Sequence, residues 1–291
     1  MNRVLQDLLD LLNLEPLEDN FFRGQSRDLG GHSVFGGQVL GQALVAASRT
    51  VVGSVPHSLH AYFLRAGDMD APIVYEVDRV RDGRSFRARR VQAIQHGRPI
   101  FSMIVSFQDP EPGLEHQIPM PDVPRPEELR FQRELRRQWI VESEQELPDR
   151  VCAALLRELA IEFKPVEPWN PLAPDQREPQ QAIWFRAAGE LPKDPLLHQC
   201  VLAYASDFNL LSTALLPYGK SWFQRDMVVA SIDHALWFHR ELRADEWLLT
   251  VMDSPSAQGA RGMSRGLIYQ ADGTLVASVA QESLMRDIRD S

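Results

Sequence analysis

Apolar residues follow two periods along the chain, and each period occurs twice. Residues 35–51 and 195–213 are apolar over a helical length, which predicts two long core helices. After each of them apolar and polar residues alternate, as in 73–77, which predicts β-strands. One long helix followed by antiparallel strands, made twice, predicts an α+β architecture in which a sheet is wrapped around each helix.

The two strand regions resemble each other in sequence. Residues 60–95 align with residues 234–269 without a gap, at a constant offset of 174. The shared order of elements supports an internal duplication. Six prolines fall between positions 110 and 126, and helices are predicted at 127–142 and 150–162. The prediction is therefore an N-terminal unit at 1–108, a proline-rich connector at 109–180 and a C-terminal unit at 181–291.

Three polar residues of the second half lie in apolar surroundings. Helical spacing places Asp207 on the same face as Tyr204, in the middle of an apolar stripe. A buried carboxylate is costly unless it is paired or used, so Asp207 is either a structural acid held by backbone amides or an arginine, or a catalytic base. Ser231 lies on a predicted strand at 227–239, and Gln281 lies among apolar residues of the last strand. The duplication places Ala46, His57 and Val105 opposite these three residues, so any chemistry is predicted to reside in the second half.

The neighbouring residues Asp233 and His234 are not predicted to act as a pair. Side chains of adjacent residues on a strand point to opposite faces, so Asp233 cannot orient His234. A hydratase-type site would need a histidine and a carboxylate together. This separation therefore argues against that chemistry.

A local basic segment stands out from the overall charge of −9, which opposes a nucleic-acid partner. Six arginines occur between positions 79 and 90, among them Arg87, Arg89 and Arg90. They form either a solvated hairpin edge or a dock for phosphate groups. Gly36 and Gly37 open the first helix, where glycine permits either a ligand at the free backbone N–H groups or close packing.

Cysteine content and apolar run length bear on location. Cys152 and Cys200 are the two cysteines, which is too few for a disulfide framework and predicts a reducing, cytoplasmic setting. No run approaches the roughly 18 apolar residues of a membrane span, so none is predicted. No metal-binding motif is recognised, and neither a metal nor an organic cofactor is expected.

Several ordered motifs resemble those of the acyl-CoA thioesterase II family over nearly the whole chain. They include Phe35-Gly36-Gly37-Gln38, His60-Ala61-Tyr62-Phe63, Tyr204-Ala205-Ser206-Asp207, Asp233-His234 and Gln281-Glu282. The resemblance implies a double hot-dog fold, a homo-oligomer of two or four chains, and hydrolysis of fatty acyl-CoA to fatty acid and CoA.

The resemblance also implies roles for single residues. Asp207, Ser231 and Gln281 match the family's catalytic positions, although several relatives have Thr where this chain has Ser231. A water activated by Asp207 and oriented by the other two would attack the thioester. Arg87, Arg89 and Arg90 would then bind CoA phosphates. Two alternatives stay open: a protein that binds acyl-CoA without turnover, and another hot-dog enzyme such as an acyl-CoA dehydratase.

Overall fold

The computed structural model describes residues 2–29, 31, 33–143 and 146–288. The α-helices and 3-10 helices are α1 Arg3–Leu12, α2 Gly36–Ser48, η1 Pro126–Glu128, α3 Gln132–Glu142, α4 Asp149–Leu156, α5 Pro195–Ala205, α6 Leu210–Leu215 and η2 Leu216–Tyr218. The strands are β1 Glu15–Glu18, β2 Phe21–Gly24, β3 Val55–Phe63, β4 Ile73–Asp82, β5 Phe86–Gln95, β6 Arg98–Gln108, β7 Ile161–Pro165, β8 Gln180–Ala187, β9 Met227–Ser231, β10 Asp233–Phe238, β11 Leu248–Gln258, β12 Arg261–Gln270 and β13 Leu275–Asp287.

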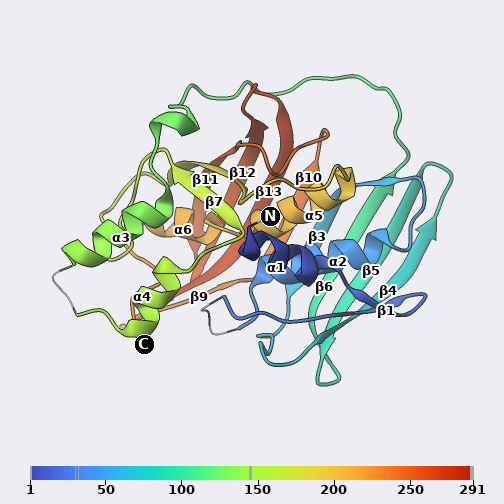
Figure 1. Ribbon diagram of the computed structural model, residues 1–291, viewed down its shortest axis with the longest axis horizontal. Helices are drawn as coiled ribbons and strands as arrows, with labels where there is room; N and C mark the ends of the chain where they lie inside the picture. The colour runs from blue at the N-terminus through green and yellow to red at the C-terminus, as the bar shows by residue number, and fades with distance from the viewer. Residues whose placement is uncertain (1, 30, 32, 144–145, 289–291) are drawn as a thin grey trace.

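The strands form one continuous antiparallel sheet with two matching halves. Its order is β1-β2-β4-β5-β6-β3-β10-β13-β12-β11-β8-β7, with β9 paired to β13. The pairing of β3 with β10 joins the halves, so that β4-β5-β6-β3 is mirrored by β10-β13-β12-β11. Figure 1 shows the first-half strands in blue to teal on one side and the second-half strands in orange to red on the other. The predicted α+β class with two sheet-and-helix units is confirmed.

The alignment offset of 174 is wrong by one residue in these strands. Val77 pairs with Val91 in the first half, and Met252 pairs with Gly266 in the second. These pairs occupy equivalent places, and 252 − 77 gives an offset of 175. Side chains alternate between the two faces of a strand. An offset of 174, one residue short of the observed 175, would therefore match inward-facing residues of one half with outward-facing residues of the other. Packing therefore sets the register, which the sparse sequence identity between the two halves does not determine.

Glycines bring the two central helices into direct contact. A Cβ atom on Gly37 would lie 2.2 Å from the carbonyl oxygen of Tyr204, and one on Gly41 would lie 3.2 Å from that of Cys200. The order of these contacts makes α2 and α5 antiparallel. The start of α2, with its free amides and positive dipole end, therefore meets the end of α5.

The second central helix is shorter than predicted. It ends at Ala205, and Asn209 adopts a left-handed conformation with φ of 69° before α6 begins at Leu210. Asparagine tolerates this conformation better than most residues, which explains the break inside an otherwise apolar run. Asp207 therefore lies in a turn between two helices and not on a helix face. The first helix also proved shorter, ending at Ser48.

The stretch Pro195–Tyr218 is long and apolar enough to span a membrane by length and composition alone, and 67% of its most apolar window is buried inside the protein. Its apolar residues are buried where α5 packs against α2 and where α6 packs against β11, β12 and β13.

The proline-rich connector covers the outer face of the second half. It contains α3 and α4, but the predicted helix at 150–162 is too long, because α4 ends at Leu156 and β7 begins at Ile161. β7 is buried except at Glu162 and pairs with β8, which extends the sheet into the range assigned to the connector. Residues Met120, Val123 and Leu129 pack on a small second core that includes Trp184. Figure 1 shows α3 and α4 beside the second half.

Candidate active site

Asp207 occupies the junction between the two central helices. Its Oδ2 accepts a 2.8 Å hydrogen bond from the backbone N–H of Gly37, at the start of α2. Its Oδ1 lies 3.5 Å from the hydroxyl of Ser231. The side chain is 4% exposed, and burial raises the pKa of Asp207 to about 7, against the opposing effects of the Gly37 amide and the Ser231 hydroxyl. A carboxylate with this pKa can accept and return a proton near neutral pH.

Ser231 and Gln281 approach Asp207 from neighbouring strands. The predicted strand at 227–239 is divided at Ile232 into β9 and β10, and both parts pair with β13. Ser231 ends β9, directly opposite Ser283 of β13. The Gln281 amide nitrogen donates to the hydroxyls of Ser231, at 2.9 Å, and Ser283, at 3.1 Å. The structure thus brings together the three residues that the sequence singled out.

His234 is a fourth member of this cluster that the sequence analysis set aside. Its Nδ1 lies 2.8 Å from Gln281 Oε1 and 3.9 Å from Asp207 Oδ1, and its Nε2 lies 2.9 Å from the hydroxyl of Ser206. Burial lowers the pKa of His234 to about 4, which leaves the ring neutral at pH 7.

The prediction that Asp233 does not orient His234 is confirmed, but a different carboxylate lies near the ring. Asp233 does point elsewhere, accepting from the backbone N–H of Glu282 at 2.7 Å, but the carboxylate near His234 is Asp207. Strand alternation excluded only the sequence neighbour and said nothing of a residue on another element. The available signal was that His234 shares its strand face with Leu236 and Phe238, which are both buried.

Gly36 and Gly37 bring the first half into the site. A Cβ atom on Gly36 would lie 2.6 Å from Asp207 Oδ2, and Gly37 leaves no room for a side chain against α5. Close packing therefore explains both glycines, and the Gly37 amide already holds Asp207. That the second half supplies the catalytic side chains stays a prediction, and the structure adds a first-half backbone amide that holds the acid. A direct contact of either glycine with substrate stays a prediction.

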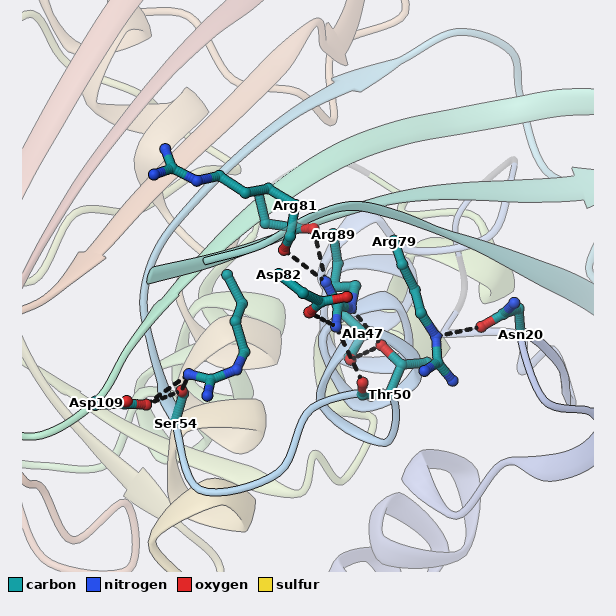
Figure 2. Close-up of polar contacts among 11 residues, drawn as sticks. Asn20, Ala47, Thr50, Ser54, Arg79, Arg81, Asp82, Arg89 and Asp109 are labelled. Carbon is teal, nitrogen blue, oxygen red and sulfur yellow. Dashed lines mark hydrogen bonds and ion pairs between the residues drawn. The ribbon is translucent and has the colours of Figure 1, made fainter. Parts of the chain in front are cut away.

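Figure 2 shows the polar contacts of the arginine-rich hairpin, among them those of Arg89 with Thr50 and Asp82. Arg89 is 2% exposed and is held at the end of α2. Its five N–H groups all have acceptors: the Thr50 hydroxyl and carbonyl, the Arg81 and Ala88 carbonyls, and the Asp82 carboxylate. No donor of Arg89 is left for a phosphate.

The other two arginines of the predicted dock are more open. Arg87 bonds Ser54 and lies 2.6 Å from Asp109, with 22% of its side chain exposed. Arg90 pairs with Asp78 at 2.5 Å, and both side chains are about half exposed. The 13 residues of α2 separate this hairpin from the Gly37–Asp207 contact, which corresponds to about 20 Å along the helix. A CoA-binding role for Arg87 and Arg90 stays a prediction.

Apolar rings surround the acid on the helix side. Phe208, the next residue after Asp207, has its ring centroid 4.4 Å from that of Phe35 and 5.2 Å from that of Phe163. Phe163 and Phe208 also line a small internal pocket beneath the turn. A larger pocket of about 1140 Å³ lies on the opposite, outer face of the sheet, and none of Asp207, Ser231 and Gln281 lines it. We place the site at Asp207, because the titratable and polar groups converge there.

Comparison with known proteins identifies the family to which this chain belongs. A family profile described as acyl-CoA thioesterase matches residues 157–284, and one described as acyl-CoA thioesterase N-terminal domain matches residues 25–108. Human acyl-coenzyme A thioesterase 8 is 45% identical over 284 residues, which cover 95% of this chain and 88% of the human protein. The chain belongs to the acyl-CoA thioesterase family. Members of this family are thioester hydrolases, and the chain is an enzyme of that class.

Solved structures support the family's fold for this chain. An acyl-CoA thioesterase II from Mycobacterium marinum superposes with a TM-score of 0.79 at 41% identity, over 98% of this chain and 100% of that one. A protein described as having a hot-dog fold, from Alicyclobacillus acidocaldarius, gives a TM-score of 0.76 at 18% identity, over 96% and 98% of the two chains. The latter likeness concerns the fold alone. The predicted double hot-dog fold is thereby confirmed.

Proposed function

We propose that this protein hydrolyses fatty acyl-CoA to a free fatty acid and CoA, using a water molecule activated by Asp207. The single observation that carries the proposal is a buried carboxylate with a pKa near 7 that contacts a hydroxyl and a helix-start amide. Membership of the family supports a thioester as the bond that is cleaved, and the arrangement of the site residues supports the mechanism. No step requires a metal or an organic cofactor.

The reaction follows from the positions of the three side chains. Asp207 takes a proton from water as the water oxygen bonds to the thioester carbonyl carbon. Ser231 holds that water by a hydrogen bond and Gln281 orients the Ser231 hydroxyl, which together reduce the entropy lost on reaching attack geometry. When the tetrahedral intermediate collapses, the carbon–sulfur bond breaks and the sulfur takes the proton that Asp207 had accepted, so that CoA leaves as the thiol and Asp207 is ionised again.

The negative charge on the former carbonyl oxygen needs hydrogen-bond donors. We infer that the start of α2 supplies them, because its first amides have no partner within the helix and it already lies against Asp207. Gly36 is the candidate, since Gly37 donates to Asp207. The absence of a Cβ atom at Gly36 would let the thioester approach the backbone.

An acyl-CoA dehydratase is the second candidate, because His234 and Asp207 lie 3.9 Å apart. Both ring nitrogens of His234 face protein atoms, however, and the ring is fully buried. A ring so enclosed cannot exchange a proton with a substrate carbon unless the site rearranges. The enclosed ring therefore favours hydrolysis over hydration chemistry. The buried base Asp207 also argues against a protein that only binds acyl-CoA, because binding without turnover does not require a base.

A release assay for free thiol over a series of acyl-CoA chain lengths tests the proposal. Hydrolysis predicts thiol release in proportion to enzyme, with a preferred chain length and no change in enoyl-CoA absorbance. Hydration of an enoyl-CoA without thiol release would establish the dehydratase instead. Tight acyl-CoA binding with neither reaction would establish a binding protein.

Assembly and location are inferred from the family and from surface composition. We infer a homo-oligomer of two or four chains in the cytoplasm. Tyr62 and Ile104 are about half exposed on paired strands of the first half, and both cysteines are free. Sedimentation analysis of the purified chain tests the assembly. A monomer at micromolar concentration would contradict it.

A further inference from the structure

His234 lies behind the three proposed catalytic residues and is closed off from solvent. Its side chain is 0% exposed, so it cannot touch a substrate in this arrangement. Both ring nitrogens are engaged, Nδ1 with the Gln281 side chain and Nε2 with the Ser206 hydroxyl. The proposed mechanism assigns no role to the His234 ring.

The Gln281 amide has two ends with different partners. Its oxygen faces His234 Nδ1 at 2.8 Å, and its nitrogen faces the hydroxyls of Ser231 and Ser283. A hydroxyl can donate or accept, so the two serines do not by themselves decide which end of the amide faces them. A ring N–H at Nδ1 does decide it, because only the amide oxygen can accept that hydrogen bond.

The direction of the amide determines where the Ser231 proton points. When the amide nitrogen donates to Ser231 Oγ, the hydroxyl proton of Ser231 is free for Asp207 Oδ1, 3.5 Å away, or for a water between them. With the amide reversed, Ser231 would donate to the amide oxygen instead. Ser231 would then have no proton left for the water or for Asp207.

We propose that His234 is a positioning residue that fixes the Gln281 amide through an Nδ1–H donor, and through it the orientation of the Ser231 hydroxyl. Its Nε2 then accepts the single Ser206 hydroxyl proton, for which the Ala203 carbonyl, 3.0 Å away, is the competing acceptor. Donation runs in one sense, from Ser206 through His234, Gln281 and Ser231 to Asp207. This inference rests on the proposed function, because it assigns a role in preparing the attacking water.

Two substitutions of the same residue separate the two ring nitrogens. His234→Asn places an amide near the position of Nδ1 and loses the contact with Ser206. His234→Gln reaches the position of Nε2 and loses the donor to Gln281. We expect His234→Asn to keep kcat within about threefold and His234→Gln to lose about 10–10²-fold, with KM within about threefold in both. Equal losses in both variants, or a rise in KM without a fall in kcat, would overturn the proposal.

A background that lacks the amide provides the matched control. In Gln281→Leu, adding His234→Gln should lower kcat no further, because the ring acts only through the amide. A further drop of tenfold or more would show that His234 acts by another route. In the same series Asp207→Asn separates this inference from the proposed function. If Asp207→Asn stays fully active the function itself fails, whereas an inactive Asp207→Asn beside an active His234→Gln refutes only the role of His234.

The protonation state of the ring gives a test that needs no variant. Nitrogen-15 spectra of the histidine-labelled protein should show a proton on Nδ1 of His234 at neutral pH. A bare Nδ1 would overturn the proposal, and it would do so even if His234→Gln failed to fold.

Discussion

Asp207 owes its proposed reactivity to burial. Taking the carboxylate out of water raises its pKa to about 7, and the Gly37 amide and the Ser231 hydroxyl limit that rise. Because the ionised form is the base, activity should depend on losing this proton. We expect kcat/KM to rise about tenfold per pH unit below pH 7 and to level off above it.

The measurement is thiol release at several pH values, quenched and read at one fixed pH. An activity plateau that continues down to about pH 5 would show that the essential base has an ordinary carboxylate pKa. That result would remove Asp207 from the role of base.

Ser231 tests whether the hydroxyl alone matters at its position. Ser231→Thr keeps the hydroxyl, and we expect activity within a few-fold of the parent. Ser231→Ala should lower kcat by about 10–10²-fold, because a lost hydrogen bond in an enclosed site is worth roughly 1–3 kcal/mol. Rapid-mix kinetics of the parent should show no initial burst of thiol. A burst equal to the enzyme concentration, with an acyl group trapped on Ser231, would indicate a covalent mechanism.

The sequence predicted which polar side chains come together better than it predicted the hydrogen bonds that hold them. Asp207, Ser231 and Gln281 were identified by polarity in apolar surroundings and by the family motifs. His234 was missed because its carboxylate neighbour in space is 27 positions earlier in the chain. Only the packing of β10 against the turn after α5 brings the two together.

At the scale of elements, the arginine-rich hairpin divides into a buried support and an exposed edge. Arg89 lies at the end of α2 and donates hydrogen bonds to five oxygen atoms, whereas Arg90 pairs with Asp78 at the surface. Arg89→Met should lower the free energy of unfolding by about 3 kcal/mol, because buried acceptors lose their donors. The matched change Arg90→Met should lower it by less than about 1 kcal/mol.

Urea unfolding of the two variants measures these differences. The same variants test CoA docking, since loss of a phosphate contact at Arg90 should raise KM and leave kcat unchanged. Equal stability of the two variants would contradict the conclusion that Arg89 supports the fold and Arg90 does not. An unchanged KM for Arg90→Met and Arg87→Met would return the hairpin to a purely structural role.

The elements themselves were largely predictable, and their ends were not. The two apolar runs became α2 and α5, but the left-handed Asn209 ended the second one early and placed Asp207 in a turn. The order of helix and strands along each half was visible in the repeated pattern. The register was wrong by one residue, because the sequence similarity between the halves is too sparse to distinguish offsets of 174 and 175.

In the whole molecule the two similar halves form one sheet with two central helices, but the halves contribute differently to the proposed site. The antiparallel contact of α2 with α5 places the start of the first-half helix against the end of the second-half helix. Asp207 is therefore held across the junction by a first-half amide. Neither half alone completes this site, and neither the composition nor a local motif revealed that dependence.

Asp207 should also affect the stability of the whole fold. Its folded-state pKa is raised above the ordinary 3.8, so stability falls as pH rises from about 4 through about 7. Asparagine carries no charge and avoids this cost. Asp207→Asn should therefore be more stable than the parent at pH 8, by as much as about 4 kcal/mol at 1.36 kcal/mol per pKa unit, and the difference should disappear near pH 4.

The turnover of the same variant shows whether Asp207 acts as the general base. With folding verified by its unfolding curve, kcat for thiol release from a good acyl-CoA substrate is compared between Asp207→Asn and the parent. Loss of the general base predicts a fall in kcat of roughly 10²–10⁴-fold. Turnover within a few-fold of the parent, in a folded variant, would contradict the claim that Asp207 activates the attacking water.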